Sequence, residues 1–103
     1  MKLIYLDSTK PDLAWYRTYY GSVFPEGASQ AAARYVKTVD NLTNNPYIGQ
    51  PIGQDGLHKL TIPRTPFTVF YRVTTSHIEI VRIWDQRADP AKLGFEEEAA
   101  VLS

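Results

Sequence analysis

Two adjacent strand-like segments in the C-terminal half constrain the fold of this chain more than any other feature. The segment "FTVFYRV" (67–73) alternates strongly, and its apolar residues Phe67, Val69, Tyr71 and Val73 fall on one face. The segment "IEIVRIW" (78–84) has the β-branched composition of a buried strand and follows after the short turn "TTSH". Strands joined by so short a connection pair as an antiparallel hairpin, so we expect a sheet.

The second of these strands ends in an unusual group of charged and aromatic residues. Simple alternation predicts one shared face for four of its residues, Ile78, Ile80, Arg82 and Trp84. The strand then continues into Asp85, Gln86 and Arg87. One interpretation is a functional site at the strand end; the alternative is a salt-bridged corner, with Arg82 paired to Asp85, Glu79 or Asp7.

Two amphipathic helices are predicted upstream of the hairpin. Apolar residues recur at helical spacing over 10–24 and again over 28–44, and only "PEG" separates the two segments. So short a connection predicts an antiparallel helical hairpin. The segment "KLIYLD" (2–7) is typical of a short strand, 45–56 of a Pro- and Gly-rich loop, and 57–62 of a further strand.

The predicted order of elements is therefore β-α-α-β-β-β, an α+β domain. We expect the helical hairpin to pack on one face of a small antiparallel sheet and to leave the opposite face partly open. Residues 1–90 form the expected domain and 91–103 an acidic tail. That tail is expected to fold back on the sheet, to extend the surface offered to a partner, or to remain solvated.

Composition excludes several classes of function. The chain has 103 residues and no cysteine, so neither a disulfide framework nor a thiolate metal site can form. Its two histidines, His58 and His77, have no second ligand at a metal-binding spacing. Neither a signal peptide nor an apolar stretch of membrane-spanning length is apparent, so we expect a cytoplasmic protein that uses no cofactor. No phosphate loop, dinucleotide fingerprint or nucleophile elbow occurs, and whether the protein is an enzyme stays open.

Basic residues concentrate in the predicted sheet. Residues 57–87 carry five of them against two acidic residues, although the formal net charge of the chain is zero. Guanidinium groups match phosphate oxygens, and aromatic faces stack on bases. The candidate residues for contact with a target or partner are Lys59, Arg64, Arg72, Arg82, Trp84, Asp85 and Arg87.

Four phrases in the same order resemble the RelE/ParE toxin superfamily of type II toxin–antitoxin pairs. They are "PDLAWYRTYY" in the first helix, "NNPYIGQP" after the second, "LHKLTIPRTPFTVFYRV" and "IEIVRIWDQRADP". The resemblance covers about residues 2–90 and implies the fold predicted above. It also implies a cognate antitoxin as partner, whose C-terminal segment wraps the toxin.

The superfamily divides into two mechanisms, and departures from its patterns favour one branch. RelE-like toxins cut mRNA on the ribosome, and here Lys59, Arg64, Arg72 and Arg87 would hold the phosphate. However, Thr68 stands where that branch has an arginine, Asp85 stands where it often has histidine, and no tyrosine follows Tyr71. The resemblance therefore favours a ParE-like inhibitor of DNA gyrase; the alternatives are the ribonuclease and an inactive relic that only binds an antitoxin.

Overall fold

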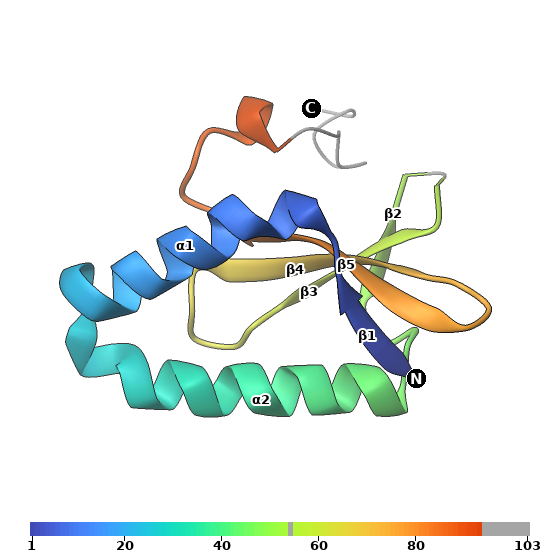
Figure 1. Cartoon of the computed structure of the whole chain (residues 1–103), viewed down its shortest axis with the longest axis horizontal. Helices are drawn as coiled ribbons and strands as arrows, with labels where there is room; N and C mark the ends of the chain where they lie inside the picture. The colour runs from blue at the N-terminus through green and yellow to red at the C-terminus, as the bar shows by residue number, and fades with distance from the viewer. Residues whose placement is uncertain (54, 94–103) are drawn as a thin grey trace.

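The computed structural model describes residues 1–53 and 55–93 and shows two helices packed against one face of a five-stranded sheet (Figure 1). The helices are α1 (Lys10–Thr18) and α2 (Ala28–Asn44). The strands are β1 (Lys2–Tyr5), β2 (Gln50–Ile52), β3 (Leu57–Thr61), β4 (Phe67–Val73) and β5 (His77–Asp85). Short 3₁₀ turns are η1 (Asp7–Thr9), η3 (Pro25–Gly27) and η4 (Pro90–Lys92), and η2 (Tyr19–Val23) is a π-helical turn. The predicted α+β fold is confirmed.

The sheet has the strand order β1-β5-β4-β3-β2. β1 lies parallel to β5, whereas the remaining neighbours pair as antiparallel strands. The long connection that a parallel pair requires is present, because both helices and β2, β3 and β4 lie between β1 and β5 in the chain. The first helix consequently runs beside β5, and its N-terminal end lies close to the middle of that strand.

One strand lies within the segment that was predicted to be a loop. Residues 45–56 contain β2, which pairs with β3 at the edge of the sheet. Pro51 is tolerated there because an edge strand does not need every backbone N–H for pairing. Gly53 and Gly56 adopt positive φ angles in the connection that follows β2. The high proline and glycine content of the segment is the reason that it was predicted to be a loop.

The first helix also differs from its prediction in its last turn. The α-helix ends at Thr18, and residues 19–23 continue it as η2. The N–H of Phe24 donates to the carbonyl of Tyr19 at 2.7 Å, which closes this wider turn. The turn keeps the aromatic rings of Tyr19 and Tyr20 packed on the core although the regular helix has ended.

The main core lies between the helices and the sheet. Its fully buried side chains include Phe67 and Tyr71 of β4 and three isoleucines of β5, Ile78, Ile80 and Ile83. Three tyrosines of α1 and η2 pack their rings against Phe67. These contacts fix the position of α1 relative to the end of β5.

A β-bulge in β5 overturns the predicted shared face of that strand. Phe70 pairs with Arg82 and Tyr71 with Ile80, so Val81 is the extra residue. Ile78 and Ile80 therefore join the main core, whereas Trp84 joins a second apolar cluster. The prediction of one face for Ile78, Ile80, Arg82 and Trp84 was wrong because an inserted residue reverses the alternation.

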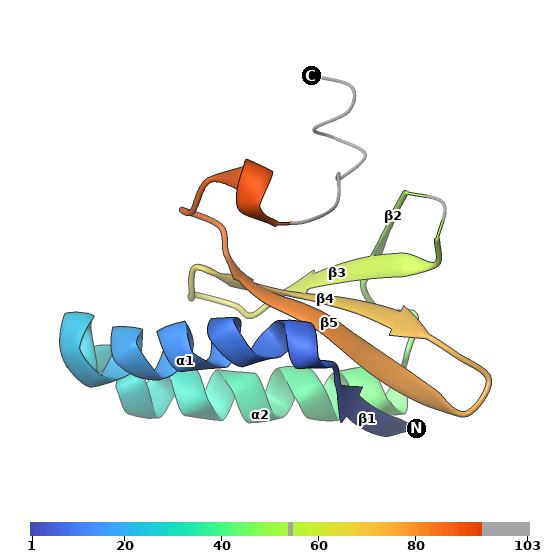
Figure 2. The same ribbon diagram turned by 45° about the horizontal axis from the view of Figure 1, so that its top comes forward.

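The second cluster covers part of the face opposite the helices. It contains Ile52, Leu57, Phe70, Trp84 and Leu93. The segment that carries η4 lies over this face, away from the helical layer (Figure 2). Leu93 is 3% exposed, so this face is open only in part. Glu96, Glu97 and Glu98, on which the predictions for the acidic tail rest, lie outside the described residues.

Candidate functional site

A cleft of about 740 Å³ opens between α1 and the end of β5. One wall comes from α1 and η2, the floor from the last residues of β5, and the other wall from the segment leading to η4. The lining residues are Asp12, Trp15, Tyr19, Val23, Arg82, Ile83, Trp84, Asp85, Arg87, Ala88 and Lys92. The cleft thus contains four of the candidate residues, Arg82, Trp84, Asp85 and Arg87.

An apolar stripe of the first helix forms one wall of this cleft. Trp15, Tyr19 and Val23 are spaced by four residues, so they lie on one side of the helix. Trp15 is 41% exposed and Val23 is 58% exposed. Such exposure of large apolar side chains beside a concavity is typical of a protein-binding surface.

Arg82 is held by a carboxylate of the first helix. Its Nε and Nη2 donate to the two carboxylate oxygens of Asp12 at 2.8 and 2.9 Å, a bidentate pair. Asp12 also accepts from the backbone N–H of Ile83 at 2.9 Å and so satisfies the edge of β5 where β1 has ended. The hydrogen bonds with Asp12 raise the pKa of Arg82.

Asp85 and Arg87 form a second ion pair, which has additional partners. Arg87 donates from Nε and Nη2 to the Asp85 carboxylate at 3.0 and 2.8 Å, and Trp15 Nε1 donates to it at 2.9 Å. These hydrogen bonds, led by those from Arg87, lower the pKa of Asp85 to about 2. The Arg87 guanidinium also lies 4.5 Å from the centre of the Tyr19 ring.

Both arginines in the cleft are therefore neutralised within the molecule. A carboxylate faces each guanidinium, and Arg82 also donates to the backbone carbonyl of Leu93 at 2.6 Å. Its guanidinium lies 5.0 Å from the centre of the Trp84 ring. Apart from Lys92, the remaining lining offers aromatic and aliphatic groups, so its chemistry suits a polypeptide better than a phosphate.

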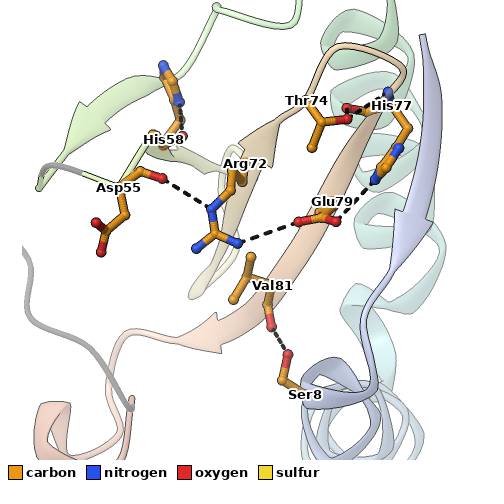
Figure 3. A network of polar contacts seen from close by, with 9 residues as sticks. Ser8, Asp55, His58, Arg72, Thr74, His77, Glu79 and Val81 are labelled. Atoms are coloured by element: carbon orange, nitrogen blue, oxygen red, sulfur yellow. Dashed lines mark hydrogen bonds and ion pairs between the residues drawn. The ribbon is translucent and has the colours of Figure 1, made fainter.

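The other predicted site residues lie elsewhere. Arg72 is on β4, where its Nε donates to the Asp55 carbonyl at 3.1 Å and its Nη1 donates to Glu79 at 3.5 Å (Figure 3). His77 Nε2 lies 3.1 Å from the other Glu79 oxygen, and this contact is the main cause of the lowered pKa of Glu79. Lys59 lies on β3, in register with Phe70 of β4.

Arg64 lies in the turn between β3 and β4, beside α2. The four cations of the ribonuclease hypothesis, Lys59, Arg64, Arg72 and Arg87, are thus distributed over the sheet, this turn and the cleft. No group of three or more histidines and acidic residues in the described part of the chain could hold a metal ion.

Sequence reasoning missed the residues that complete the cleft. Asp12, Trp15, Tyr19 and Val23 were not among the candidate site residues. The helix is apolar on two neighbouring sides, one packed on the core and one lining the cleft. The wide apolar surface of this helix could have indicated the cleft from the sequence, because a helix that covers one core needs only one apolar stripe.

The fold and the cleft define a small α+β protein with a surface suited to binding another polypeptide. Residues 3–90 match the family described as the ParE toxin of the type II toxin–antitoxin system parDE. A chain from the chromosomal ParDE toxin–antitoxin system of P. aeruginosa is similar, with 34% identity and a TM-score of 0.61. The similarity covers 81% of this chain and 92% of that chain. No match was found among curated proteins.

The chain belongs to the ParE toxin family of type II toxin–antitoxin systems. The resemblance to the RelE/ParE superfamily, and its preference for the ParE-like branch, is confirmed. In the described part of the chain, no helix has the length and apolar character needed to cross a membrane.

Proposed function

We propose that this protein is a growth-inhibiting toxin that acts on DNA gyrase through protein contacts and is neutralised by a cognate antitoxin. The observation that carries the proposal is the cleft between α1 and β5, in a chain of the ParE family. Its arginines are paired internally, and apart from Lys92 the rest of its lining is aromatic and aliphatic. Interfaces concentrate their binding free energy in such apolar anchors.

The charges of the cleft support a protein partner rather than an RNA substrate. Cleavage of RNA without a metal needs cations free to stabilise the phosphorane charge, together with a base and an acid. Arg82 and Arg87 are each held by a carboxylate that is at least nine-tenths buried. Redirecting either arginine to a phosphate would leave a buried carboxylate unpaired, which is costly.

The same cleft accounts for neutralisation by an antitoxin. A segment of the antitoxin that inserts an apolar side chain against Trp15 and Val23 would cover the surface offered to gyrase. Inhibition and neutralisation would then compete for one surface. This arrangement requires no change in the toxin fold, because the cleft is already formed in the free chain.

A supercoiling assay tests the proposal directly. Purified protein at micromolar concentration should prevent gyrase from supercoiling relaxed plasmid, and a peptide from the antitoxin should restore the reaction. Full supercoiling in the presence of the protein would refute gyrase as the target. Growth arrest with intact gyrase activity and fragmented mRNA would instead indicate a ribonuclease, and absence of growth arrest would indicate a relic.

A further inference from the structure

A second groove, of about 330 Å³, lies between α2 and the turn that joins β3 to β4. Its lining residues are Arg34, Lys37, Thr38, Asn41, Pro63 and Arg64. A neighbouring hollow of about 390 Å³ shares Arg34 and Arg64 with it and has Glu26 among its own lining residues. No described carboxylate lines the first groove, so three cations define its charge.

These cations differ from the two arginines of the α1–β5 cleft in their partners. Within the described part of the chain, Lys37 and Arg64 form no hydrogen bond or ion pair through their side chains. Among the same residues, Arg34 donates only to the neutral side chain of Gln30, at 3.0 Å. Spacings of three and four residues place Arg34, Lys37 and Asn41 on one side of α2, facing the turn. Their charge is available to a ligand.

The backbone of Arg64 gives an independent indication that its side chain has a role. Arg64 has a φ angle of 58°, in the left-handed region that favours glycine. This conformation costs a non-glycine residue about 1 kcal/mol or more. The turn around Arg64 is fixed, because Thr65 N and Thr65 Oγ1 donate to the Ile62 carbonyl at 3.2 and 2.9 Å. Glycine would adopt this backbone conformation at a lower free-energy cost, yet the position carries a cation that faces α2.

We propose that this groove binds the phosphodiester backbone of duplex DNA. Guanidinium and ammonium groups match phosphate oxygens, and hydroxyl and amide groups such as those of Thr38 and Asn41 commonly complete such contacts. Among the described residues that line this groove, Pro63 alone is apolar, whereas Tyr20, Phe24 and Ala31 line the neighbouring hollow. The groove itself therefore lacks the apolar contacts that a peptide interface uses. This inference rests on the proposed function, since a toxin bound to gyrase lies beside the DNA that gyrase holds.

Fluorescence anisotropy of a short labelled duplex, measured with the isolated protein, tests the groove without gyrase. Three phosphate contacts predict that log Kobs falls with log salt concentration at a slope of about −2.7. Affinity should therefore drop roughly 40-fold between about 50 and 200 mM salt. Each of the variants Arg34→Gln, Lys37→Gln and Arg64→Gln should reduce the magnitude of the slope by about one. Arg17 is exposed on α1 and lines neither the α1–β5 cleft nor this groove, so Arg17→Gln should leave the slope unchanged.

Arg64→Gly distinguishes loss of the cation from loss of the fold. It removes the guanidinium and releases the backbone strain, so it should weaken DNA binding while thermal stability is kept or raised. Binding that is independent of salt, or equal in all variants, would overturn the inference. Tighter binding of a polyglutamate peptide that depends on the same three residues would also overturn it and assign the groove to an acidic protein.

The gyrase assay separates this inference from the proposed function. Suppose that the wild type and the variant lacking all three cations inhibit supercoiling equally and that neither binds DNA. The groove inference then fails and the gyrase proposal stands. If the protein binds duplex with the expected slope but supercoiling proceeds normally, the gyrase proposal fails and the groove inference stands.

Discussion

Replacing Asp85 by asparagine should destabilise the protein, because Arg87 and Trp15 would lose the charged acceptor that they share. Asp85 is 8% exposed and accepts hydrogen bonds from Trp15 and from three nitrogens of Arg87. Its pKa falls from 3.8 to about 2 in the folded protein. A decrease of that size corresponds to about 2 kcal/mol of stability at neutral pH. For a chain of this length, Asp85→Asn should lower Tm by roughly 8–16 °C.

The pH dependence gives the prediction its sign. A carboxylate whose pKa is depressed by folding stabilises the native state above its unfolded pKa, and this stabilisation is lost as the pH falls through the folded value. The difference in free energy of unfolding between wild type and Asp85→Asn should therefore be largest near neutral pH. It should shrink below the unfolded value of 3.8 and approach its minimum near pH 2.

Urea denaturation of both proteins across this pH range provides the measurement. Asp40→Asn, an exposed position of α2, is the matched control and should change stability by less than about 0.5 kcal/mol. A double-mutant cycle with Arg87→Gln should show strong coupling, because the two residues share hydrogen bonds. A difference between wild type and Asp85→Asn that stays constant down to pH 2 would refute the reasoning.

Two further substitutions test the contacts that position the cleft and the sheet. Asp12→Asn should lower the free energy of unfolding, measured by urea denaturation, by about 3 kcal/mol, because Arg82 would lose the charge of a partner whose side chain is 8% exposed. A decrease below about 1 kcal/mol would contradict this account. Gly49→Ala should cost about 1–3 kcal/mol, because the added Cβ would lie 2.6 Å from both the Lys59 carbonyl and the Tyr71 hydroxyl. Unchanged thermal unfolding of Gly49→Ala would show that this close approach can relax.

The fold could be predicted from the sequence where periodicity is local. The segment 28–44 was predicted as a helix and 67–73 as a strand with the bounds that the structure shows, because their apolar spacing is regular. β2 escaped detection because an edge strand of three residues carries little apolar pattern and contains Pro51. The bulge at Val81 could not be predicted, because register depends on the partner strand.

The cleft was only partly predictable, for a related reason. A salt-bridged corner was one interpretation of the strand end, with Arg82 as the paired cation; the structure has an ion pair at this corner, but between Asp85 and Arg87. The partner of Arg82 is Asp12, 70 residues away in the sequence, rather than any of the three acids considered. Charge counts locate cations along a chain, but only the fold decides which cations remain unpaired.

The central claim is that the α1–β5 cleft contacts gyrase, and a comparison of two variants in the supercoiling assay tests it most directly. Val23→Asp places a charge in the cleft, whereas Val36→Asp places it on α2, where Val36 is 66% exposed and outside the cleft. We predict that wild type and Val36→Asp inhibit gyrase equally and that Val23→Asp does not. Equal inhibition by both variants, or none by the wild type, would contradict the account.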